Sequence, residues 1–85
     1  MSNEFLAFKE TDRASFIQFI DLLRKDFLAN PEKWENNNLD RFLDAISAYT
    51  SDIQVYYDNT KSGVNADEPS WQTFADIFKG ATMYE

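Results

Sequence analysis

The sequence predicts a small all-α domain, and two observations carry this prediction. Apolar residues recur at steps of three and four along three stretches of the chain, which is the spacing of one face of a helix. Eight Phe, four Tyr and two Trp supply a dense core without disulfide or metal staples. We therefore expect one domain, residues 1–85, built as a bundle of three main helices.

The first main helix is expected at about residues 12–29, with Thr11 or Asp12 as its N-cap. Pro31 ends it, because a proline biases the preceding residue away from the α conformation. Its core stripe consists of Phe16, Ile20, Leu23 and Phe27. Residues 1–10 fit either a short N-terminal helix or an extended arm.

A short helical turn is expected near residues 31–35, with Pro31 at its first position. Trp34 follows and is expected to close one end of the core. The second main helix, about 38–58, has the clearest pattern in the chain. Its apolar face comprises Leu39, Phe42, Leu43, Ile46, Tyr49, Ile53, Tyr56 and Tyr57.

The polar stretch after Asp58 contains Gly63 and Pro69 and reads as a loop. The third main helix is expected at about residues 70–84, with Trp71, Phe74, Ala75, Phe78 and Thr82 on one face. A glycine inside a helix costs about 1 kcal/mol. Gly80 therefore indicates that a neighbouring helix approaches closely.

The composition disfavours several classes of function. There is no Cys and no His, so thiolate catalysis, zinc–thiolate sites and the usual proton shuttle are missing. The net charge of −7 disfavours nucleic acid and anionic membranes as partners. The sequence shows neither a transmembrane segment nor a signal peptide, so we expect a cytoplasmic protein.

The loop at residues 58–68 partly matches a calcium-binding EF-hand loop. Asp58, Thr60 and Ser62 give oxygen side chains at positions one, three and five, and Gly63 stands at position six. Position twelve, which should be a bidentate Glu, is Pro69. Calcium binding is therefore only a weak alternative.

No catalytic residue, cofactor or metal ligand is expected. Asp40 and Asp44 lie one helical turn apart on the polar face of their helix, and Asp21 and Asp26 fall outside the apolar stripe of theirs. Carboxylates in such positions are ordinarily solvated surface groups. The serines have no histidine to act as a base.

The tyrosines suggest a surface for partners, because tyrosine combines apolar area with a polar tip. Tyr49, Tyr56 and Tyr57 form this candidate surface, with Trp34 or Trp71 as an anchor. The alternative is that these rings pack at the edge of the core with their hydroxyls in water.

Two segments resemble a family of small bacterial proteins that is classed only as a domain of unknown function. The resembling residues are Asn30-Pro31, Trp34-Glu35-Asn36, Leu39, Phe42-Leu43, Trp71, Ala81 and Tyr84-Glu85. The resemblance implies a stand-alone bacterial helical domain and supplies no activity or catalytic residue. Independently of it, we expect Glu35 or Asn36 to satisfy helix-end groups and to hold Trp34 against the last helix.

Two classes of function remain. The first is a non-catalytic protein-interaction module, such as a small acidic inhibitor or immunity-type protein that binds a basic partner. The second is a self-associating structural or accessory domain that forms a homodimer through its aromatic edge. Neither the partner nor the oligomeric state follows from the sequence.

Overall fold

The computed structural model describes residues 12–84. This part contains three α-helices, α2 (Arg13–Ala29), α3 (Leu39–Asn59) and α4 (Trp71–Ala81). A short 3-10 helix, η1 (Pro31–Lys33), lies between α2 and α3, and the described residues contain no strand. The predicted all-α class and its three main helices are confirmed. The N-terminal segment expected at residues 1–10 lies outside the described residues.

Each α-helix begins at a residue whose side chain caps it. Asp12 caps α2: its carboxylate accepts a hydrogen bond of 2.8 Å from the Ser15 backbone, and the Ser15 hydroxyl accepts one from the Asp12 backbone. The bonds that Ser15 donates lower the pKa of Asp12. Asn38 and Ser70 cap α3 and α4 in the same way, each accepting from a backbone N–H three residues on.

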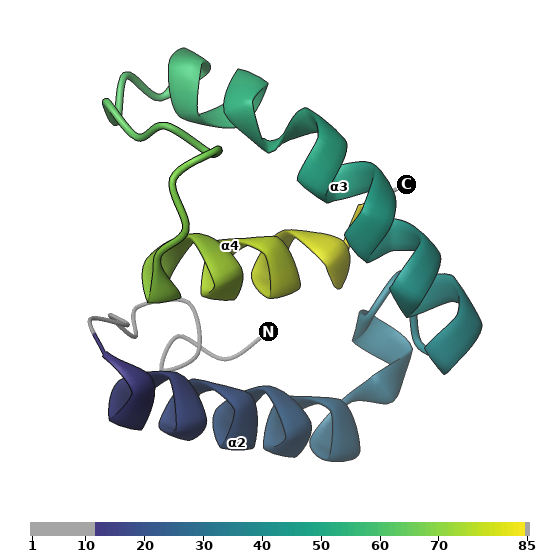
Figure 1. Cartoon of the computed structure of the whole chain (residues 1–85). Coiled ribbons are helices and arrows are strands. Elements are labelled where there is room, and N and C mark those ends of the chain that lie inside the picture. The colour runs from purple at the N-terminus through teal and green to yellow at the C-terminus, as the bar shows by residue number, and fades with distance from the viewer. Residues whose placement is uncertain (1–11, 85) are drawn as a thin grey trace.

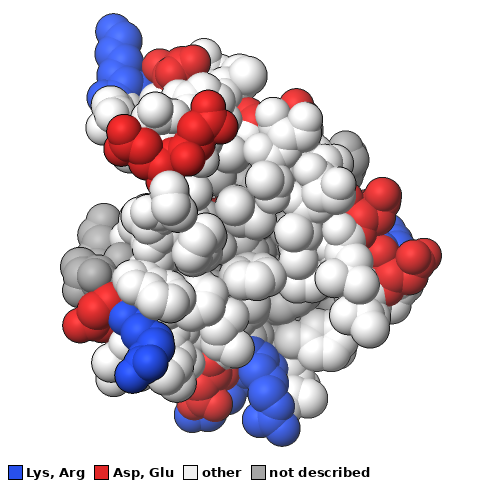
Figure 2. Space-filling view, in the orientation of Figure 1, with Lys and Arg blue, Asp and Glu red and all other residues white. Residues whose placement is uncertain are grey.

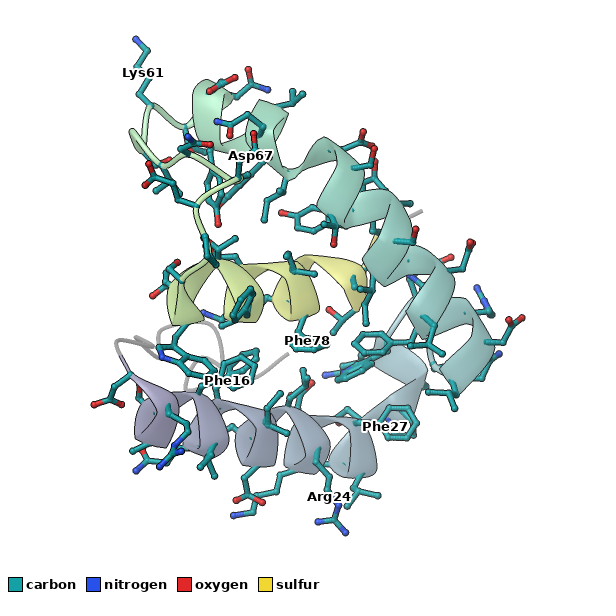
Figure 3. All side chains as sticks on the ribbon, in the orientation of Figure 1. Phe16, Arg24, Phe27, Lys61, Asp67 and Phe78 are labelled. Carbon is teal, nitrogen blue, oxygen red and sulfur yellow. The ribbon has the colours of Figure 1, made fainter. Side chains whose placement is uncertain are left out.

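The helix α4 lies between the two longer helices and packs on both (Figure 1). The buried core includes Phe19, Leu23, Trp34 and Ala75. Aromatic rings continue from this core along the interfaces, and Figure 3 shows Phe16 and Phe78 between α2 and α4. Neighbouring ring centroids are 5.1–6.3 Å apart along the row Trp71, Phe16, Phe78, Phe42, Trp34 and Phe27.

At Gly80, α4 approaches α3 closely. A Cβ atom at this position would overlap the ring of Tyr49, which lies directly against the glycine. The close approach expected from the sequence is confirmed. The ring of Tyr49 also contacts Tyr84 at a centroid distance of 5.2 Å, so the residues after α4 pack on α3 as well.

The helix α4 ends at Ala81, three residues before the expected end, because Asn36 binds its C-terminus. The Asn36 amide donates to the carbonyl oxygens of Ala81 at 2.9 Å and Tyr84 at 2.5 Å. The backbone N–H of Asn36 donates to the Thr82 carbonyl at 3.1 Å. Asn36 is buried and satisfies helix-end groups as expected, whereas Glu35 pairs instead with Arg41.

Four residues expected in the core are exposed instead. Leu39 is 72% exposed and Leu43 is 55% exposed, and Ile20 and Phe74 also reach the surface. The prediction failed because periodicity identifies the apolar face of a helix but not how far a neighbouring helix covers it. The contacts of α4 with α3 include Phe42, Tyr49 and Tyr57, whereas the side of α3 that carries Leu39 and Leu43 stays uncovered.

We expect Asn36→Ala to destabilise the chain by about 2 kcal/mol, because buried carbonyls then lose their donors. Chemical denaturation would measure this change. The matched control is Asn37→Ala, since Asn37 is exposed and its amide makes one long hydrogen bond of 3.4 Å. Equal effects of the two substitutions would contradict the role of Asn36.

Candidate functional site

A groove lies where α2, the segment after η1 and the start of α3 come together. Its volume is about 300 Å³. The apolar lining residues are Ile20, Leu23, Phe27, Trp34, Leu39 and Phe42. Arg24 and the three asparagines 36–38 complete the lining. The groove is therefore an aromatic and aliphatic concavity with polar groups at its edge, which is the usual composition of a binding site.

Trp34 forms a rigid part of the groove lining. Its Nε1–H donates a hydrogen bond of 2.8 Å to the Asp26 carboxylate. Its ring contacts Phe27 at 5.1 Å and Phe42 at 5.6 Å between centroids. These contacts fix the indole from three directions and leave Trp34 only 7% exposed. It closes one end of the core, as the sequence suggested.

The prediction that Asp26 is a solvated surface group was wrong. It is buried, and its carboxylate accepts the indole N–H of Trp34. A buried carboxylate is costly unless hydrogen bonds satisfy it. Asp26 therefore ties α2 to the segment that lines the groove.

Both lips of the groove are themselves apolar and exposed. On the α2 side, the lining residue Ile20 is 37% exposed, and on the α3 side the lining residue Leu39 is 72% exposed. On the α3 side, Leu43 follows Leu39 by one helical turn and shares its direction. Exposed apolar side chains around a groove are typical of interaction sites.

Charged side chains flank the lips rather than the groove floor. Figure 2 shows uncharged residues across the middle of the molecule and charged residues toward its edges. Asp40 and Asp44 are exposed on α3, where Asp40 directly follows Leu39 and Asp44 lines a separate hollow with Arg41 and Tyr84. Neither forms an ion pair or side-chain hydrogen bond within residues 12–84. Arg24 stands on the other lip and extends away from α4 (Figure 3).

The tyrosines and tryptophans expected to form one interaction surface are dispersed. Trp34 and Tyr57 are buried, so they do not offer an exposed surface. Tyr49 packs against α4, whereas Tyr56 and Trp71 are exposed in different parts of the fold. The five residues therefore do not form a single exposed surface.

Tyr57 belongs to the packing of α3 on α4. Its hydroxyl donates a hydrogen bond of 2.7 Å to the Asp76 carboxylate. Burial, followed by this bond to a carboxylate, raises the pKa of Tyr57 far above its ordinary value. Burial also raises the pKa of Tyr49.

The loop at 58–68 is held by protein side chains. Gln54 donates to the Val64 carbonyl and to the Asp58 carboxylate, both at 3.0 Å, and accepts from the Ala66 backbone at 2.7 Å. Gly63 adopts a left-handed conformation with φ of 74°. Within residues 12–84, no three acidic side chains come close enough together to hold a metal ion. Asp58, the first expected calcium ligand, is engaged by Gln54 instead.

Comparison with known proteins gives one match. The model of a family of unknown function, DUF7660, matches residues 12–85. The match agrees with the resemblance to a family of unknown function that the sequence suggested. The comparisons with curated proteins and with solved structures gave no match. None of the helices in the described part of the chain is long and apolar enough to cross a membrane.

We expect Trp34→Phe to lower the free energy of unfolding by about 1–3 kcal/mol, because the buried Asp26 carboxylate loses the indole N–H. Urea denaturation would measure the loss. Trp71→Phe is the matched control, since Trp71 is more than a third exposed and should change stability by less than about 1 kcal/mol. A neutral Trp34→Phe would show that this bond does not support the groove.

We also expect stability to decline as the pH rises above about 10, the ordinary pKa of tyrosine. The folded chain retains the Tyr57 proton to higher pH than the unfolded chain does, so the stabilisation is complete below that pH and is lost above it. Tyr57→Phe should therefore be less stable at neutral pH yet decline less steeply under alkaline conditions. Unfolding free energies measured from pH 7 upward test this, with Tyr56→Phe expected to follow the original chain.

Proposed function

Since the chain belongs to the family of unknown function DUF7660, whose description names no activity, we propose a function from the groove itself. The chain is a non-catalytic protein-interaction domain that holds a partner between α2 and α3. The observation that carries the proposal is the apolar groove of about 300 Å³ with exposed apolar side chains on both lips.

The groove has the features of an energetic centre for binding. Burial of apolar surface contributes roughly 25 cal/mol per Å². Aromatic residues in well-packed pockets dominate many protein interfaces. Trp34 is already immobilised by Asp26, Phe27 and Phe42, so a partner does not have to order it.

The net charge of −7 favours a basic partner, because complementary charges speed association. In this reading the domain is a small acidic inhibitor or immunity-type protein that covers a basic surface in the bacterial cytoplasm. Its role is non-catalytic, and the absence of His and Cys from the sequence supports this part of the proposal.

Leu39→Asp tests the groove with little risk to folding. Leu39 is 72% exposed and is the first residue of α3, where a negative charge is favourable. Val55→Asp introduces the same charge on the same helix at a residue that is 60% exposed and does not line the groove.

We expect one protein from the source cells to bind both the original chain and the Val55→Asp variant. The same protein should not bind the Leu39→Asp variant. Affinity capture with quantitative mass spectrometry of the three baits would measure this. The purified partner should then bind Leu39→Asp at least about 10-fold more weakly in calorimetry. Equal binding to all three chains would contradict the groove as the binding site.

Self-association is the second candidate, and the same apolar lips favour it, because a second copy could cover them. Light scattering on the purified chain separates the two. A dimer that Leu39→Asp dissociates would assign the groove to self-association. A monomer would leave the groove free for a different protein.

A further inference from the structure

The form of the partner can be inferred from the hydrogen-bonding groups of the groove, on the premise that the proposed function is correct. We infer that the groove receives one amphipathic α-helix of the partner. This helix places apolar side chains at positions i, i+3 or i+4, and i+7 into the groove, and carries Lys or Arg along the edge that faces α3.

The polar groups over the floor of the groove are already hydrogen-bonded, and the groups left for a partner, such as the Arg24 guanidinium and the Asn37 amide, lie at its edge. The Trp34 Nε1–H already donates a hydrogen bond to the Asp26 carboxylate, and the Asn36 amide already donates to the carbonyl oxygens of Ala81 and Tyr84. The Asn38 side-chain oxygen accepts from the backbone of α3. An extended or polyproline segment would therefore leave the backbone groups that lie over the apolar floor unsatisfied, which is unfavourable.

A helix avoids this cost because its backbone groups bond to one another. The walls of the groove are also helices, so they have no sheet edge to which a strand could add. Of the common modes of peptide recognition, a helix in a groove is the one that these walls permit.

The dimensions agree with about two turns of helix. On α2, the lining residues from Ile20 to Phe27 span about 10 Å at 1.5 Å per residue. Anchors at i, i+3 or i+4, and i+7 span the same length on one face of a helix.

The charges beside the groove set the orientation of the flanking residues. Asp40 directly follows Leu39 at the start of α3 and has no ion pair in the described part of the chain, whereas Asp44 lines a separate hollow with Arg41 and Tyr84. Arg24 stands on the α2 lip. Basic residues of the partner helix are therefore expected on the α3 side, where they face Asp40.

The test uses a synthetic peptide of about 15 residues, long enough to form a helix. It has Leu at the anchor positions and Lys elsewhere. A second peptide has the same composition, reordered so that its Leu residues no longer share one face of a helix, and a third replaces Lys with Glu. Binding is followed by fluorescence in a Trp71→Phe background, where Trp34 is the only tryptophan and lies in the groove.

We expect the Leu–Lys helix to bind and to shift the emission of Trp34, and the other two peptides to bind more weakly. Leu39→Asp should weaken binding about 10-fold, whereas Val55→Asp should not. Asp40→Asn should weaken binding and reduce its dependence on salt. Simple attraction between charges predicts the opposite for Leu39→Asp, since the added negative charge would then tighten binding.

Several results would overturn the inference. These are no binding of the Leu–Lys helix at millimolar concentration, equal binding of the reordered peptide, and binding that Leu39→Asp leaves unchanged or tightens. If any of these results occurs while Leu39→Asp still fails to bind the cellular partner, the proposed function is retained and the inference of a bound α-helix is rejected. If Leu39→Asp also retains the partner, both fail.

Discussion

The shortness of α4 is the constraint on which the rest of the structure depends. Its 11 residues join two helices of 17 and 21 residues that pack mainly on it. At about 1.5 Å per residue, α4 is roughly half the length of α3. Apolar faces that a longer helix would bury remain open at the far ends of α2 and α3, and the groove forms there.

The connection between α2 and α3 compensates for this short central helix. Trp34 and Asn36 lie two residues apart and bind different helices. The indole of Trp34 binds Asp26 and fixes the groove, whereas Asn36 binds the C-terminus of α4. The same few residues therefore line the candidate site and hold the central helix in place. A partner in the groove would contact the segment that stabilises the fold.

Local sequence signals predicted most of the secondary structure. Asp12, Pro31, Asn38 and Ser70 act at helix ends through contacts with near neighbours, which a sequence displays directly. The close approach at Gly80 was also predictable, because a glycine within a helix needs a packing reason. The end of α4 at Ala81 was not, since its cap is a side chain 45 residues away.

The groove could not be predicted for a related reason. Helical periodicity assigned Leu39 and Leu43 to an apolar face correctly, but whether another helix covers that face depends on packing between distant segments. The burial of Asp26 could not be predicted, because a carboxylate near an apolar stripe is assigned to the surface unless its hydrogen-bond partner is known. That partner, the Trp34 indole, is eight residues away across a helix end.

The combination of apolar lips with a net charge of −7 also has a colloidal consequence. Two free copies that approach lip to lip gain from burying leucine and isoleucine, but they repel each other as acidic particles. This repulsion extends over only about 8 Å at physiological ionic strength and shortens further as salt is added. Added salt should therefore promote association of free copies through their exposed apolar side chains, whereas at low salt the acidic surface opposes it.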